Sequence, residues 1–167
     1  IVRTTPGNIP QYDVKRIEAR VANAARTWND NLRLELIERR GEEKGIEVCK
    51  RFAEAFPVAY QERFSAEESV VDIEGIERLL ATGELQVELY ERQLRHGSEL
   101  RCKLIHGGEV LTLSEMIPHF ENMGLKVSLV LPFDVNVPAA PTKVHVRDFH
   151  LEAHGLPVDI EAVRETF

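Results

Sequence analysis

Residues 85–91 read LQVELYE and residues 100–106 read LRCKLIH, and these two stretches decide the fold. In each of them apolar side chains alternate with polar ones, which predicts a β-strand with one buried face and one face in water. A short loop that contains Gly97 joins the two stretches. We therefore expect them to pair as an antiparallel hairpin.

A helix is predicted after this hairpin. A capping box at residues 112–115 (TLSE) opens it, and Gly124 ends it. Pro118 should kink this helix or confine its regular part to the C-terminal side. Further strands are predicted at residues 125–131 and 144–151, and a final helix follows them.

From residue 100 onward the predicted order is strand, helix, strand, strand, helix. That is the ferredoxin-like order without its last strand. We expect the strand over residues 85–91 to occupy the slot of the missing strand, because the first strand would otherwise keep an unpaired edge. Leu85, Val87 and Leu89 of this strand should then face the same helices as Leu100, Cys102 and Leu104 of the neighbouring strand.

The first half of the chain has a helical pattern. Apolar residues at spacings of three and four predict one long helix over residues 13–40, with Gly41 as its stop. Shorter helices are predicted over residues 42–56, ended by a proline, and over residues 65–83, opened by a capping box. The expected apolar stripe of the long helix is Val14, Ile17, Val21, Ala24, Ala25, Trp28, Leu32, Leu36 and Ile37. Trp28, Phe52 and Phe56 are interpreted as core residues.

The fold class predicted from these patterns is α+β. A helical segment, one long helix and two shorter ones, spans residues 13–83. An antiparallel sheet module with helices on one face spans residues 84–167, and the pattern of its last helix suggests a truncated C-terminus. Residues 1–12 are interpreted as the tail of a preceding module.

Composition favours an ordinary globular protein that binds neither nucleic acid nor membrane. The net charge is −7, and lysine and arginine alternate with glutamate along predicted helices, so a positive face for phosphates is not expected. No apolar run of membrane-spanning length and no signal peptide is recognised. Cys49 and Cys102 lie among apolar neighbours and are expected to be free, buried thiols in a cytoplasmic protein.

Motifs that hold nucleotides or catalyse reactions are missing from the sequence. Neither of the glycine patterns that cradle dinucleotides or triphosphates is present, nor are the G-x-S-x-G and H-E-x-x-H patterns of hydrolases. We therefore expect no catalytic residues and no cofactor site in this chain.

Histidine and cysteine offer two alternatives, which we consider weaker than structural roles. His145, His150 and His154 lie near Asp148, but alternation along a strand points the first two to opposite faces, so we expect no metal site. Cys102 and His106 share a strand face by parity, yet Cys102 belongs to a core-facing series, so a buried thiol is favoured over a nucleophile.

The Gly107-Gly108 loop is the one candidate site. It joins a strand to a helix N-terminus, where free N–H groups and the helix dipole favour a carboxylate ligand such as that of an amino-acid effector. The alternative is a tight turn that needs a positive φ angle. Both interpretations remain open from the sequence.

Several segments resemble the large bacterial NAD-dependent glutamate dehydrogenases. The most specific are FPVAYQERF and ENMGLKV, and the matching segments are residues 1–7, 56–64, 113–118, 121–127 and 144–149. The resemblance implies an N-terminal region of ACT-like domains and helical segments, so the sheet module would be ACT-like. Members of this family deaminate L-glutamate oxidatively to 2-oxoglutarate and ammonium with NAD.

The resemblance also implies a role for the chain. The catalytic and NAD-binding residues of the family lie in a downstream core and match no motif here, so NAD would belong to the parent enzyme. The chain would be a non-catalytic regulatory or assembly region whose partners are the rest of the parent chain, other subunits and an amino-acid effector. The alternative is a free-standing module that senses an amino acid or another small molecule.

Overall fold

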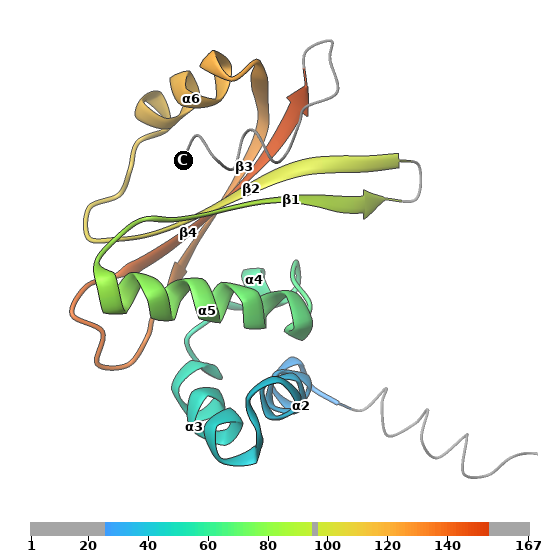
Figure 1. Cartoon of the computed structure of the whole chain (residues 1–167), viewed down its shortest axis with the longest axis vertical. Coiled ribbons are helices and arrows are strands. Elements are labelled where there is room, and N and C mark those ends of the chain that lie inside the picture. The colour runs from blue at the N-terminus through green and yellow to red at the C-terminus, as the bar shows by residue number, and fades with distance from the viewer. Residues whose placement is uncertain (1–25, 95–96, 154–167) are drawn as a thin grey trace, which may run out of the picture.

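The computed structural model describes residues 26–94 and 97–153 and confirms an α+β fold (Figure 1). The described elements comprise five helices and four strands. In chain order they are α2 (Trp28–Arg40), α3 (Glu42–Phe52), α4 (Val58–Gln61), α5 (Ala66–Thr82), β1 (Gln86–Leu94), β2 (Gly97–Gly107), α6 (Leu113–Asn122), β3 (Leu125–Val135) and β4 (Val144–Ala153).

The predicted single helix over residues 13–40 is wrong, because a new helix begins at Trp28. Thr27 has an extended conformation and caps α2: its hydroxyl accepts from the Asp30 N–H, and the Asp30 carboxylate accepts from the Thr27 N–H. This reciprocal capping ends the backbone pattern of any preceding helix. The predicted apolar positions from Val14 to Ala25 lie outside the described residues, as do the tail over residues 1–12 and the final helix.

The other helices differ from the prediction mainly at their ends. α3 stops at Phe52 rather than at residue 56, and residues 53–56 form turns that lead to Pro57. The short helix α4 follows this proline and was not predicted. α5 is confirmed: Ser65 and Glu68 form its capping box, and Gly83 ends it in the left-handed conformation.

The four strands form one antiparallel sheet in the order β1-β2-β4-β3. β1 pairs with β2 and therefore occupies the slot of the missing ferredoxin-like strand, as predicted. Leu85 is an exception, because it precedes β1 and is exposed. β3 runs four residues beyond the prediction, through Pro132, which is tolerated because β3 is an edge strand.

α6 covers one face of the sheet (Figure 1). Its Met116 and Phe120 belong to one core cluster with apolar side chains from all four strands. Pro118 lies inside α6, so it does not confine the helix to its C-terminal side. The buried members of this cluster are Leu89, Cys102, Leu104, Met116, Phe120, Leu125, Phe149 and Leu151.

The helical segment covers the opposite face, where the sequence predicts water. α5 lies across that face, below the sheet in Figure 1, and shares one core with β2, β3 and β4. Arg101 and Lys103, predicted to be on the wet face, are only 5% and 3% exposed. The alternation of β2 was thus read correctly, but both of its faces are buried.

Three aromatic residues predicted to be core residues are confirmed there. Phe52 and Phe56 are buried, and half-buried Trp28 packs edge-on against Phe56. The Trp28 indole N–H donates to the Phe64 carbonyl at 3.0 Å, which ties α2 to the end of the segment after α4. The helical segment is therefore packed around an aromatic cluster that also reaches Phe133 of β3.

Candidate functional site

A buried ion pair joins the helical segment to the sheet. The Lys103 Nζ atom on β2 lies 2.9 and 2.8 Å from the two carboxylate oxygens of Asp72 on α5. Asp72 is fully buried, and the hydroxyl of Tyr60 on α4 donates to the same carboxylate. Three elements therefore meet at one carboxylate, which we call the Lys103 joint: Lys103, Asp72 and Tyr60.

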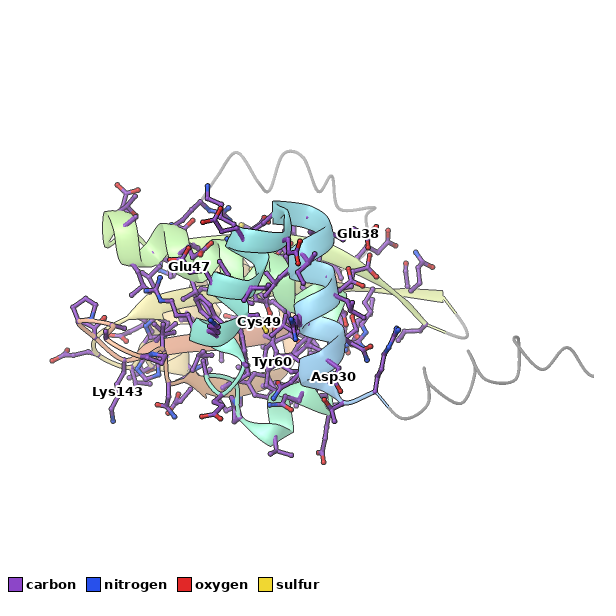
Figure 2. The ribbon with its side chains drawn as sticks, turned by 90° about the horizontal axis from the view of Figure 1, so that it is seen from below. Asp30, Glu38, Glu47, Cys49, Tyr60 and Lys143 are labelled. Atoms are coloured by element: carbon purple, nitrogen blue, oxygen red, sulfur yellow. The ribbon has the colours of Figure 1, made fainter. Side chains whose placement is uncertain are left out.

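Aromatic rings complete the surroundings of the Lys103 ammonium group. Its Nζ lies 4.0 Å from the centre of the Phe64 ring and 5.3 Å from that of Tyr90, distances at which a cation is attracted by a ring face. Burial, and then the charge of Asp72, raise the pKa of Tyr60 well above its usual value, so this phenol remains a donor. Tyr60 lies near the centre of the molecule as seen from below (Figure 2).

A second polar network crosses the strands on the same face of the sheet. Arg101 Nη1 on β2 lies 2.9 Å from Asp148 Oδ2 on β4, and the Tyr90 hydroxyl on β1 donates to the other carboxylate oxygen. Arg101 also binds Glu99, whose second oxygen lies 2.8 Å from His150 Nδ1. Burial raises the pKa of Asp148, and the nearby Arg101 opposes that rise. These contacts hold β1, β2 and β4 in one register.

The histidines considered for a metal site lie apart. His150 contacts Glu99 on the α5 face, whereas His145 contacts Asp134 and the carbonyl of Gly108. Within the residues 26–94 and 97–153, no group of three or more potential ligands is arranged to hold a metal ion. His154 lies outside the described residues.

Cys102 belongs to the apolar core under α6, as predicted. Its side chain is completely buried, and burial raises the pKa of its thiol to about 12. A thiol in these surroundings is a poor nucleophile. Cys49 is also free and buried, which confirms the prediction for both cysteines.

The Gly107-Gly108 loop has the geometry of a constrained turn. Gly108 has a φ angle of +81°, and its N–H donates to the Lys143 carbonyl at 3.2 Å. A Cβ atom on Gly107 would lie 2.8 Å from the Thr142 hydroxyl, whereas one on Gly108 would meet nothing within 4 Å. The loop is therefore packed against the β3–β4 connection on one side and open on the other.

The N-terminus of α6, next along the chain, is capped by its own carboxylate. Glu115 Oε2 accepts from the Thr112 N–H at 3.0 Å and from the Thr112 hydroxyl at 2.7 Å, contacts that lower the Glu115 pKa. A ligand that used this terminus in the way the sequence suggests would have to compete with Glu115.

A cluster of basic side chains lies beside the loop, and sequence reasoning did not identify it. His106 of β2 is opposite His145 of β4, and their rings stack with centroids 5.0 Å apart. Asp134 of β3 is opposite His145 on its other side, with Oδ1 2.8 Å from the His145 Nδ1 atom. The other ring nitrogen of His145 lies 3.3 Å from the Gly108 carbonyl oxygen. Arg147 is the fourth member, and we call His106, His145, Arg147 and Asp134 the histidine corner.

His106 is the member of the histidine corner with an unpaired ring nitrogen. It is 4% exposed, and its buried Nε2 atom has no hydrogen-bond partner among the described residues. Burial, and then the proximity of His145 and Arg147, lower the pKa of His106 below its usual value. The folded chain therefore favours the neutral imidazole, and protonation of His106 opposes folding.

We expect His106 to make the chain sensitive to acid. Because its pKa is lower in the folded state, the unfolded chain binds the proton more readily, and stability is lost as the pH falls below about 6.5. The free energy of unfolding of a His106→Leu variant should change less between about pH 7 and pH 5 than that of the wild type. Urea unfolding at several pH values measures both, with the exposed His119→Leu as the control. Parallel curves for wild type and His106→Leu would disprove this assignment.

No helix in the described part of the chain is long and apolar enough to cross a membrane.

Two models of known families match the chain. Residues 35–79 match the model described as glutamate dehydrogenase, helical motif 2, and residues 84–163 match glutamate dehydrogenase, ACT3 domain. The first match ends within the last turn of α5, and the second begins just before β1. The Lys103 joint connects the two matched parts, because Asp72 lies in the first match and Lys103 in the second.

Two curated relatives are bacterial NAD-specific glutamate dehydrogenases. The protein of Halomonas elongata is 36% identical over 158 residues, which are 94% of this chain and 10% of that protein. The protein of Pseudomonas aeruginosa is 32% identical over 166 residues, 99% of this chain and 10% of that protein. The chain thus spans about a tenth of the length of these relatives. It belongs to the glutamate dehydrogenase family and carries the helical motif 2 and the ACT3 domain of that family.

Proposed function

We propose that the chain is a non-catalytic regulatory or assembly region of a cytoplasmic, oligomeric NAD-dependent glutamate dehydrogenase. The complete enzyme would convert L-glutamate, NAD and water into 2-oxoglutarate, ammonium and NADH, with NAD bound in another part of the parent chain. The partners of this region would be the rest of that chain and the other subunits. The small share of the relatives' length that the chain spans favours this role over a free-standing sensor.

The observation that carries the proposal is the Lys103 joint. A buried ion pair whose two charges must meet allows few alternative packings, because any other arrangement leaves a buried charge unpaired. Here the pair lies between the helical motif and the ACT3 sheet, and Tyr60 adds a third attachment. A change in the position of α5 would therefore move β2, which suits a part that transmits or fixes a geometry.

The loop of Gly107 and Gly108 is the place where this role would involve an effector. The loop lies at the end of β2, the strand that also carries Lys103, so a ligand there and the helical segment would act on the same strand. We propose an amino acid as the effector.

The chain on its own should show no dehydrogenase activity. Mixed with L-glutamate and NAD, it should produce no increase in NADH absorbance, because its sequence has no dinucleotide cradle. The full-length enzyme under the same conditions provides the positive control. Turnover by the purified chain above the rate in buffer would contradict a non-catalytic role.

The regulatory or assembly role is tested in the full-length enzyme with Lys103→Met. We expect this variant to change subunit assembly, measured by sedimentation, or the response of the glutamate KM to amino acids. Lys126→Met, which removes an exposed ion pair with Glu152, is the matched control and should match the wild type. The double variant Asp72→Asn/Lys103→Met leaves no unpaired charge in the joint, and it replaces the single variant in this test if the single variant does not fold. If a folded variant assembles and responds as the wild type does, the proposal is wrong.

A further inference from the structure

The histidine corner has an unusual balance of charge and hydrogen bonds. It brings together two imidazoles and one guanidinium group, and the single carboxylate among them, Asp134, has a side chain that is 65% exposed. The remaining neighbour of His145 in the corner is the Gly108 carbonyl. Basic groups therefore outnumber acidic groups at a place that is otherwise buried.

The contacts of Asp134 are already divided between two partners. Its Oδ1 atom lies 2.8 Å from His145 Nδ1, and 3.4 and 3.5 Å from the two terminal nitrogens of Arg147. The guanidinium group makes its shortest contact, 3.0 Å, with the carbonyl oxygen of Phe133. None of these acceptors serves His106 Nε2, so a second anion would find there a ring nitrogen that nothing else uses and that donates when the imidazole is protonated.

The unpartnered Nε2 of His106 is the observation that points to a ligand. Leaving a buried donor or acceptor unpaired is costly, and such atoms in native proteins usually meet a water, an ion or a ligand. The other ionisable groups that act on this ring are His145, Arg147 and Asp134. The guanidinium charge of Arg147 acts on this position, so it disfavours a metal cation and favours an anion.

We propose that the histidine corner binds a small oxyanion, either a carboxylate or a phosphate, to which His106 Nε2 donates a hydrogen bond while Arg147 supplies charge. The ligand would enter beside Gly108, which is exposed and has open space where a side chain would lie. Binding would raise the pKa of His106, because a negative charge next to an imidazole stabilises the imidazolium form.

This inference deepens the proposed effector role of the Gly107-Gly108 loop, and its use in regulation rests on that proposal. The binding itself does not, because it is measured on the isolated chain. An anion can bind the isolated chain even if the assembly and kinetics of the full-length enzyme do not respond to it. Likewise, the full-length enzyme can respond to an amino acid even if no anion binds at the histidine corner.

The test follows the imidazole resonances of His106 by NMR in the chain. The probes are inorganic phosphate, acetate and L-glutamate, each titrated at constant ionic strength in a chloride buffer. We expect saturable shifts of the His106 ring and a higher His106 pKa in the presence of the bound probe. Affinity should rise by up to about tenfold for each unit by which the pH falls between the His106 pKa of the bound chain and that of the free chain.

The three probes separate the sources of the oxyanion. Saturation by phosphate alone indicates a phosphate ligand, equal binding of acetate and L-glutamate indicates a simple carboxylate, and tighter binding of L-glutamate indicates an amino acid. Each of these three results supports the site. Shifts that do not saturate with any probe overturn it.

Variants then show whether the corner residues make the site. Arg147→Met and His106→Gln should each weaken the binding of the saturating probe by at least about tenfold, the loss expected for one charge-assisted hydrogen bond. The control variant Lys126→Met replaces an exposed lysine of β3 and should bind the probe as tightly as the wild type does. If either corner variant does not fold, the proposal is judged from the wild type alone, by whether its His106 shifts saturate and its His106 pKa rises with the probe. Equal affinity of the folded corner variants and the wild type overturns the proposal.

Discussion

Replacing Lys103 with methionine is expected to lower the free energy of unfolding of the chain by about 3–5 kcal/mol. The methionine would leave the Asp72 carboxylate buried with the Tyr60 hydroxyl as its remaining donor in the joint, and an uncompensated buried charge is costly. It would also remove the cation that lies 4.0 Å from the Phe64 ring. Urea unfolding followed by circular dichroism measures the change at constant pH.

The double variant Asp72→Asn/Lys103→Met distinguishes the cost of an unpaired buried charge from the loss of other contacts of Lys103. If the loss comes from an unpaired charge, removing both charges should restore a large part of the stability, and the two substitutions should be strongly non-additive. Lys126→Met removes an exposed pair with Glu152 and should cost less than about 1 kcal/mol. A small effect of Lys103→Met, or additive effects of the two substitutions, would show that the joint does not hold the two parts together.

The burial of Lys103 marks the limit of what strand alternation predicts. The pattern in residues 100–106 correctly identified the two faces of β2, and the slot of β1 followed from the need to cover an edge. Alternation says which side chains share a face, but not whether another element covers that face. A lysine on a covered face needs a carboxylate from the covering helix, and Asp72 lies far away in the sequence.

The break before α2 was visible in the sequence, although the helical pattern concealed it. The apolar stripe continues from the residues before Thr27 through Trp28 and Leu32, so the spacing alone favours one helix. Thr27 and Asp30, however, stand in the spacing of a capping box, and their reciprocal hydrogen bonds start a new helix. A local capping signal therefore outweighs continuity of the apolar stripe.

The histidine corner could not be predicted from the sequence, because it depends on strand register. The Gly107-Gly108 loop was found from local signals, since a glycine pair before a capping box is a short-range feature. His106, His145 and Asp134 come together only because β2 and β3 both pair with β4 at these positions. A shift of one residue in either pairing would move these side chains to opposite faces.

A second large effect on the free energy of unfolding is expected from Gly45→Ala. This substitution should destabilise the chain, although alanine favours helices more than glycine does. Gly45 lies inside α3, where alanine would normally stabilise a helix by about 1 kcal/mol. A Cβ atom on Gly45 would lie 2.6 Å from two backbone atoms of Ile37 and 2.7 Å from the Leu36 carbonyl oxygen. Because the obstacle is the backbone of α2, relief requires that the two helices separate. We expect a net loss of about 2–3 kcal/mol in the free energy of unfolding.

Gly75→Ala is the control that tests this explanation, because its obstacle is a movable side chain. Gly75 lies inside α5, and a Cβ atom there would lie 2.7 Å from Ile105 Cδ1, the flexible end of that residue. Ile105→Val removes this methyl group, so adding Gly75→Ala to Ile105→Val should increase stability by up to about 1 kcal/mol, the gain in helix propensity. No comparable truncation exists for Gly45, since its neighbours are main-chain atoms. If Gly45→Ala proved as stable as the wild type in urea unfolding, the close approach of α2 and α3 would be wrong.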